Sequence, residues 1–151
     1  LSFAVSHQNV EDEMMKKRVF LNAPLSSLAE QKLNEEITSI AVASGFDMYL
    51  PQEALPLGSG ISAIEIFEAN IEAVRNCDIA LCVLDKPGLG VGFELGFAVA
   101  LNKPIIAFRS DRQDYLGKIL EGLWENLEER DKARKLGELE RVLKMYAEVA
   151  E

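Results

Sequence analysis

The stretch from Asp78 to Ala100, DIALCVLDKPGLGVGFELGFAVA, constrains the fold more than any other part of the sequence. Its apolar, partly β-branched run over 79–84 predicts a buried strand. The Asp-Lys-Pro triplet and the glycines that follow predict a turn, and the apolar segment after them predicts a helix. A buried strand that leads through a turn into a helix is typical of a parallel α/β sheet.

The remaining chain repeats this alternation of strand and helix. Further strands are predicted at Val19–Asn22, Phe46–Leu50 and Pro104–Phe108. A helix is expected to begin at Ser26 or Ser27, with Glu30 completing a capping box, and to end at Gly45. Another is expected over 63–76, with Ile64, Phe67, Ile71 and Val74 on its buried apolar stripe. A loop is expected over 51–62, and a helical pattern over 115–151. We therefore expect an α/β fold with a doubly wound parallel sheet of four to five strands, ordered 2-1-3-4, and C-terminal helices.

Composition supports one globular domain. The chain has 151 residues, of which 48% are hydrophobic and 27% charged, enough to bury a core. Residues 1–13 have no clean periodicity and are expected to form an extension, so the single domain is expected to span 14–151. The net charge of −9 argues against a nucleic-acid polymer as partner. A small anionic ligand stays compatible with it, because helix N-termini bind anions without net positive charge.

Other features indicate a cytoplasmic protein. Cys77 and Cys82 lie in or beside the predicted central strand without partners at metal-ligand spacing, so we expect small core residues of a reducing compartment and no metal. The sequence has no apolar run long enough to span a bilayer and no signal-peptide segment at its start. We therefore expect no membrane partner.

The glycine turn does not match the common cofactor motifs. In G-x-G-x-x-G spacing from Gly90, the last glycine would fall on Leu95, and no G-x-x-x-x-G-K is present. NAD and ATP are thus disfavoured, and no cofactor is expected. Gly88, Gly90 and Gly92 either cradle a sugar or phosphate oxygen through backbone N–H groups or only permit a tight turn and close packing.

Two polar residues are candidates for chemistry. Glu94 is expected in the first turn of its helix, where unpaired N–H groups and the helix dipole would keep it ionised. At the carboxyl end of a strand, such a carboxylate is a candidate nucleophile, although the dipole alone also explains it. Asn70 lies about 60° from the centre of its helix's apolar stripe, so it either reaches a cleft rim or forms a solvated edge.

Four segments together resemble a known family. They are VFLNAPLSSLAEQKLNEEI, GFDMYLPQE, IFEANIEAVRNCDIALCVLD and GLGVGFELGFAVALNKPIIAFRSD, and they run from about Val19 to Asp111. They resemble the nucleoside 2-deoxyribosyltransferase superfamily, including its 2′-deoxynucleoside 5′-phosphate N-hydrolase branch. The resemblance implies a flavodoxin-like sheet, a homo-oligomer, and cleavage of the N-glycosidic bond through a Glu nucleophile at Glu94.

The chain departs from that family at several positions. Phe20 stands where members usually have Tyr, Asn70 where they have Asp, and Gly88 where they have Asp or Ser. Pro24 aligns with a phosphate-binding Ser of the hydrolase branch, and Gly117 aligns loosely with a Ser reached from a neighbouring subunit. Because the Asn70 amide cannot give up a proton as a carboxylic acid does, Asp85 at the end of the central strand is the substitute for that role.

We therefore predict an enzyme that cleaves or transfers at the N-glycosidic bond of a nucleoside or nucleoside 5′-monophosphate. The catalytic candidates are Glu94, Asn70 and Asp85, and the substrate-binding candidates are Phe20, Asn22, Pro24, Gly88, Gly90, Gly92 and Gly117. The site is expected at the carboxyl ends of the first and third strands. The alternatives are a non-catalytic nucleotide-derivative binding protein with a degenerate pocket and an oligomeric scaffold without a ligand. We expect at least a homodimer, because the apolar stripes of the C-terminal helices exceed what a four-stranded sheet needs.

Overall fold

A five-stranded, all-parallel sheet forms the centre of the computed structural model, which describes residues 16–110 and 115–149. Its strands are β1 (Arg18–Asn22), β2 (Asp47–Tyr49), β3 (Ile79–Val83), β4 (Ile105–Phe108) and β5 (Lys132–Ala133). They are ordered β2-β1-β3-β4-β5, and every neighbouring pair is parallel. The predicted doubly wound sheet and its order 2-1-3-4 are confirmed, with β5 as the fifth strand.

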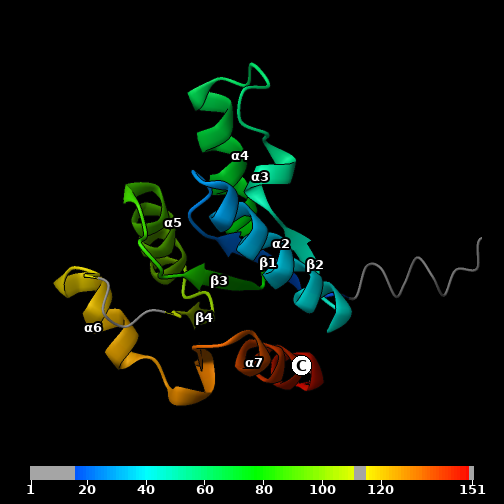
Figure 1. The fold of residues 1–151 in the computed structure, drawn as a ribbon, viewed down its shortest axis with the longest axis vertical. Coiled ribbons are helices and arrows are strands. Elements are labelled where there is room, and N and C mark those ends of the chain that lie inside the picture. Colours follow the sequence, from blue (N-terminus) through cyan, green and yellow to red (C-terminus); the bar gives the residue numbers. More distant parts are fainter. Residues whose placement is uncertain (1–15, 111–114, 150–151) are drawn as a thin grey trace, which may run out of the picture.

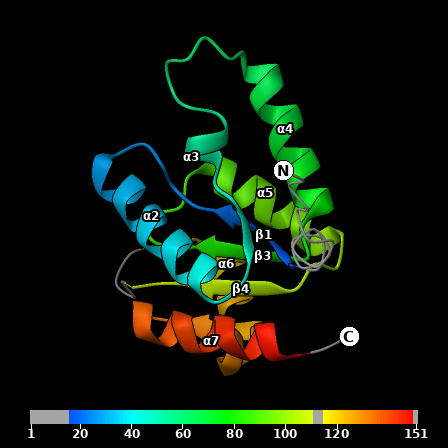
Figure 2. The same ribbon diagram turned by 90° about the vertical axis from the view of Figure 1, so that its right-hand side faces the viewer.

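Helices cover both faces of the sheet. They are α2 (Leu28–Ala43), α3 (Pro51–Ala54), α4 (Ala63–Asn76), α5 (Leu89–Ala100), α6 (Lys118–Asn126) and α7 (Leu136–Glu148), with a 3₁₀ turn η1 (Glu129–Asp131) before β5. One face packs on α2 and α7, and the other packs on α4, α5 and α6. Figures 1 and 2 show the two helical layers on either side of the strands.

The core is divided by the sheet into two apolar clusters. All five residues of β3 are buried, and their side chains alternate between the two clusters, with Leu81 on the α2–α7 side and Cys82 on the α4–α5–α6 side. A strand buried on both faces reads in sequence as a continuous apolar run. This explains why the stretch after Asp78 predicts the centre of the fold.

Capping boxes start the two helices that follow β1 and precede β3. The Ser27 hydroxyl accepts from the Glu30 N–H, and the Glu30 carboxylate accepts from the Ser27 N–H, as predicted. Ser62 and Glu65 form the same reciprocal pair at the start of α4. Each pair satisfies two N–H groups that a helix terminus would otherwise leave unbonded.

Three expectations about helices and loops need correction. The segment predicted as a loop over 51–62 begins with the short helix α3. The C-terminal segment is not wholly helical, because β5 interrupts it. The apolar stripe of α7 is expected to exceed what the sheet needs, but Leu139, Val142 and Leu143 are buried against the chain's own sheet, whereas Ile119 on the stripe of α6 is exposed.

Large apolar side chains are exposed on the first half of α4, on the first half of α5 and, at Ile119, on α6. Ile64 and Phe67, predicted as part of a buried stripe, are exposed, and of that stripe only Val74 is fully buried. The amino-terminal half of α4 extends beyond the edge of the sheet in Figures 1 and 2. Its apolar side chains therefore have no sheet beneath them.

The extension predicted over 1–13 lies outside the described residues. Within the described part of the chain, every helix is too short or too polar to cross a lipid bilayer.

Candidate active site

The candidate site lies where the connections of the sheet change direction. The chain leaves β1 towards β2 on one side, and β3 lies on the other side of β1. In open α/β sheets, ligands bind at the carboxyl ends of the strands beside such a switch point. Asn22 ends β1 and Tyr49 ends β2, while α5 begins six residues after β3, so these elements meet at one edge.

A hydrogen-bond chain joins three elements at this edge. Asn70 of α4 donates from Nδ2 to Glu94 Oε1 of α5 at 2.9 Å. Tyr49 of β2 donates from its hydroxyl to Asn70 Oδ1 at 3.3 Å. All three side chains are part-buried. The structure thus brings Glu94 and Asn70 together.

The electrostatic setting of Glu94 differs from the expected one. Helix α5 begins at Leu89, so Glu94 lies in its second turn, and the prediction of a first-turn carboxylate is wrong. Burial raises the pKa of Glu94, and the hydrogen bond from Asn70 lowers it in part. Burial disfavours the charged form of a carboxylate, whereas a donor favours it. The charged form of Glu94 is therefore disfavoured by burial and favoured by the Asn70 amide, rather than stabilised by the dipole of a first helical turn.

The glycine run forms the start of α5 rather than a separate turn. Gly88 is the N-cap with φ −81°, and Gly90 and Gly92 lie within the helix. A Cβ added to any of them would meet no atom within 4 Å in the described chain. Close packing therefore does not require glycine here. The role of these residues in holding a substrate oxygen stays a prediction.

The two substrate-binding candidates on β1 are buried and contact β2 or α5, the elements that carry Tyr49 and Glu94. Phe20 has no exposed surface, and its ring stacks on Tyr49 with centroids 5.6 Å apart. Asn22, also buried, donates from Nδ2 to the Val91 carbonyl at 2.9 Å and so ties β1 to the first turn of α5. Its Oδ1 has no hydrogen-bond partner among the described residues. Phe20 thus packs against Tyr49, and Asn22 holds the start of α5 against β1.

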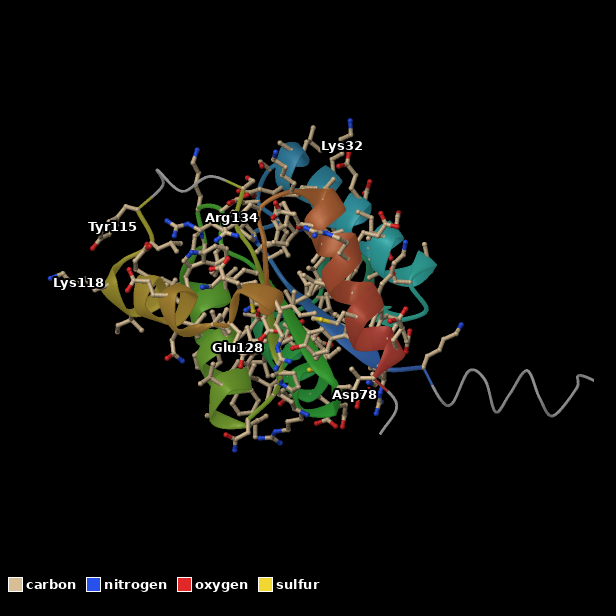
Figure 3. The ribbon with its side chains drawn as sticks, turned by 90° about the horizontal axis from the view of Figure 1, so that it is seen from below. Lys32, Asp78, Tyr115, Lys118, Glu128 and Arg134 are labelled. Atoms are coloured by element: carbon tan, nitrogen blue, oxygen red, sulfur yellow. The ribbon has the colours of Figure 1, made fainter. Side chains whose placement is uncertain are left out.

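The other candidates lie around the same edge. Asp85 accepts hydrogen bonds from the backbone and hydroxyl of Ser110, so it links the ends of β3 and β4. Pro24 follows β1, and its carbonyl accepts from Asn34 Nδ2 at 2.9 Å. Gly117, with φ +75°, begins α6 at an outer corner where Tyr115 and Lys118 project outward (Figure 3). Roles in catalysis or binding for these three stay predictions.

Sequence reasoning missed Tyr49 and a network of amides beside it. Gln52 of α3 accepts from Asn34 Nδ2 and donates to the Gln31 carbonyl, while the Gln31 side chain donates to the Leu25 carbonyl. The network joins the loop after β1 to α2 and α3. The available signal was the spacing of Asn34, which lies three residues before Ile37 and seven before Ala41 on the buried side of α2, because a buried amide requires partners.

A comparison with protein families decides the assignment. The model of the nucleoside 2-deoxyribosyltransferase family matches residues 19–144. The chain belongs to the nucleoside 2-deoxyribosyltransferase family. The resemblance deduced from the four sequence segments is confirmed.

Proteins with similar sequences are named as N-hydrolases. The chain is 27% identical over 115 residues to a protein of Thermofilum pendens named as a 2′-deoxynucleoside 5′-phosphate N-hydrolase, covering 72% of this chain and 80% of that one. It is 32% identical over 107 residues to the 5-hydroxymethyl-dUMP N-hydrolase of Rattus norvegicus, covering 64% and 61% of the two chains. The chain thus matches less than two thirds of the rat enzyme's length.

A solved structure of the family has the same fold. The 2-deoxyribosyltransferase of Bacillus psychrosaccharolyticus superposes with a TM-score of 0.68 at 18% identity, over 82% of this chain and 90% of that one. At this identity, the likeness shows the fold alone.

Proposed function

We propose that the protein cleaves or transfers at the N-glycosidic bond of a nucleoside or nucleoside 5′-monophosphate, with Glu94 as the nucleophile. Family membership supports the bond that is attacked. The hydrogen bond from Asn70 to Glu94 at the switch point is the observation that supports Glu94. A part-buried carboxylate with a directed donor at the ligand-binding edge of such a sheet is suited to attack on a sugar.

The proposed reaction has two steps. An oxygen of ionised Glu94 forms a bond to the anomeric carbon while the bond from that carbon to the base nitrogen breaks. The electron pair of that bond leaves with the base, which takes up a proton. Water, or a second base in a transfer, then attacks the anomeric carbon and releases the Glu94 carboxylate. The transition state is positively charged on the sugar, so the carboxylate also stabilises it.

Hydrolysis of a nucleoside 5′-monophosphate is the version to test first. The similar proteins of Thermofilum pendens and Rattus norvegicus are both named as hydrolases of nucleotide substrates. The acidic chain is no obstacle to a phosphate, because the N-terminus of α5 has no side-chain cap and a helix N-terminus can bind an anion without net positive charge. The preferred base and the preference for ribose or deoxyribose are determined by the substrate panel described next.

The test is the release of free base from matched nucleosides and 5′-monophosphates, each in ribo and deoxyribo form, followed by chromatography. Glu94→Gln is expected to abolish release, because an amide is nearly isosteric but a poor nucleophile. The control is Glu72→Gln on α4, since Glu72 also accepts from an Asn amide, Asn76 Nδ2 at 2.7 Å, but is exposed. Turnover of Glu94→Gln within a few-fold of wild type would contradict the proposal. A thermal shift without any base release in wild type would favour a binding protein instead.

We further propose that a homo-oligomer covers an apolar surface on α4 and α5. This α4–α5 surface consists of Ile64, Phe67, Leu89 and Phe93, all exposed, with Leu89 96% exposed. The rings of Phe67 and Phe93 lie 6.1 Å apart and make the surface continuous across the two helices. Exposed apolar patches of this kind mark interaction sites. Light scattering is expected to show a dimer or larger species that Ile64→Glu weakens, and a wild-type species of only 16.7 kDa at micromolar concentration would refute it.

Two predictions about the whole chain stay proposals. They are the division into an extension over 1–13 and one domain over 14–151, and the cytoplasmic location.

A further inference from the structure

Tyr49 lies at the far end of the hydrogen-bond chain that reaches Glu94. It is the last residue of β2, and its hydroxyl donates to Asn70 Oδ1 at 3.3 Å. The other end of the same amide, Nδ2, donates to Glu94 Oε1 at 2.9 Å. A single amide therefore transmits the position of the phenol to the carboxylate.

The chemistry of the three groups fixes which group donates in each of the two hydrogen bonds. An ionised carboxylate only accepts hydrogen bonds, so the nitrogen of the Asn70 amide must face Glu94. The amide oxygen then faces Tyr49, and the phenol must donate to it. If the amide turned over, its oxygen would face the carboxylate and the phenol proton would lose its acceptor. Tyr49 thus favours the one amide orientation that suits an ionised Glu94.

We propose that Tyr49 is a positioning residue that holds Glu94 in its ionised form through the amide of Asn70. The effect on reactivity rests on the proposed function of Glu94, whereas the effect on ionisation does not.

The position of the phenol is itself fixed by the sheet. Tyr49 is the register partner of Phe20, and their rings stack with an angle of 23° between the planes. Because Phe20 is fully buried, it gives the Tyr49 ring a rigid support. Burial, followed by the charge of Glu94, raises the pKa of Tyr49, so the hydroxyl stays protonated and able to donate at neutral pH.

The other groups that face Glu94 are neutral at physiological pH. From β3, Cys82 feels the charge of Glu94, and burial raises its thiol pKa to about 12. From α4, the facing group is the amide of Asn70, and the cation of that helix, Arg75, stacks on Phe97. From β1, the polar group that contacts α5 is the amide of Asn22, which donates to the Val91 carbonyl. Among the described residues, the hydrogen bond from Asn70 is therefore the polar interaction that sustains the charge of Glu94.

The decisive measurement is the pKa of Glu94 with and without the Tyr49 hydroxyl. Tyr49→Phe removes that hydroxyl and keeps the ring that stacks on Phe20. The pKa is read from carboxyl ¹³C shifts in glutamate-labelled protein, and the Glu94 signal is assigned by its absence in Glu94→Gln. We expect Tyr49→Phe to raise the Glu94 pKa by about half to one pH unit, because the amide no longer keeps one orientation. An unchanged Glu94 pKa would overturn the inference.

The matched control removes a similar hydroxyl elsewhere. Tyr146 of α7 is also part-buried and donates to a carboxylate oxygen, Asp131 Oδ1, at 2.8 Å. Helix α7 covers the opposite face of the sheet from α4 and α5. Tyr146→Phe is therefore expected to leave the Glu94 pKa unchanged, and an equal rise in this variant would also overturn the inference.

A double-mutant cycle tests whether the Tyr49 hydroxyl changes the Glu94 pKa through the Asn70 amide or by a general loosening of the fold. Asn70→Ala removes the connecting amide, so adding Tyr49→Phe to it is expected to cause no further rise in the Glu94 pKa. A further rise of the same size would show that the phenol acts by another route and would refute the proposal.

The activity of the same variants distinguishes this inference from the proposed function. With base release present, the acid limb of the pH–rate profile of Tyr49→Phe is expected to move upward by the same amount as the pKa, with the plateau retained within a few-fold. A shifted pKa in a protein that releases no base would leave the positioning role standing and refute the proposed function. Base release with an unshifted pKa and acid limb would refute the positioning role alone.

Discussion

The Asn70→Asp substitution puts a second carboxyl group against Glu94. The amide nitrogen it replaces is 2.9 Å from Glu94 Oε1. Two unit charges roughly 4 Å apart repel by about 4 kcal/mol at an effective dielectric constant of about 20. That energy corresponds to about three pH units. The two carboxyl groups therefore cannot both be ionised near neutral pH, and the pair shares one proton.

The sharing of a proton changes the expected shape of the pH–rate profile. In wild type, base release is expected to rise once, as Glu94 ionises, and then to stay level. In Asn70→Asp the active form has one proton, with Glu94 ionised to attack and the new carboxylic acid able to protonate the leaving base. The profile is then bell-shaped, and its two limbs belong to the pair rather than to either residue. Between the limbs, activity on deoxynucleoside substrates is expected to exceed that of wild type.

The assay is kcat and kcat/KM for base release across the pH range in which the protein stays folded. Asn70→Ala is the control, because it removes the amide without adding an acid, and it is expected to give lower activity with a single limb. The reasoning would be refuted if the pH–rate profile of Asn70→Asp had a single limb at the same pH as that of wild type. Residue 70 would then have no effect on the ionisation of Glu94.

Three further predictions follow from the same edge of the sheet. Phe20→Tyr adds a hydroxyl that is expected to crowd or hydrogen-bond the lower face of the sugar and so to shift the ratio of kcat/KM towards deoxyribo substrates, and an unchanged ratio would assign Phe20 to the core alone. Ser62→Ala removes the cap of α4 and is expected to lower the free energy of unfolding by about 1 kcal/mol in urea titrations; no loss would show that the capping box is unimportant. Burial raises the Glu94 pKa above its unfolded value, so its contribution to stability is present below the unfolded pKa and is lost as pH rises through the folded pKa. Glu94→Gln is therefore expected to have a higher Tm than wild type at neutral pH, but not at pH values below the ordinary pKa of Glu.

The central strands and the capped helices are predictable because their causes are local. The run over 79–84 is apolar without interruption, as a strand covered on both faces requires. Ser27 and Glu30 are three residues apart and bond each other directly, so the sequence alone predicts the start of α2. By contrast, β5 has two residues, and its pairing with β4 depends on a distant part of the chain.

The wrong position of Glu94 within its helix has a definite cause. Gly90 and Gly92 are poor helix formers and suggest a turn that continues to the glutamate. In the structure, Val91 is buried in the first turn of α5, and Leu95 and Ala98 are buried in the apolar cluster on the sheet. This burial outweighs the low helix propensity of the glycines, so the helix begins earlier and Glu94 falls in its second turn.

Tyr49 could not be assigned from sequence for a different reason. An aromatic residue at the end of a short strand is typical of β-structure and indicates no chemistry by itself. Its hydroxyl meets Asn70, which is 21 residues away on another element. Such a contact exists only after β1 and β2 have paired and α4 has packed, whereas periodicity reports only which face of one element is apolar.

The setting of Glu94 connects stability with the proposed chemistry. Within residues 16–110 and 115–149 no cationic side chain pairs with it, so its charge is sustained by the neutral amide of Asn70 against burial. In the proposed reaction, positive charge develops on the sugar beside this carboxylate in the transition state. The attraction between the two is absent in the free enzyme and greatest at the transition state, and only such differential interactions accelerate the chemical step. A Lys or Arg placed beside Glu94 would stabilise the free carboxylate more than the transition state. The neutral chain from Tyr49 through Asn70 fixes the carboxylate without offsetting its charge.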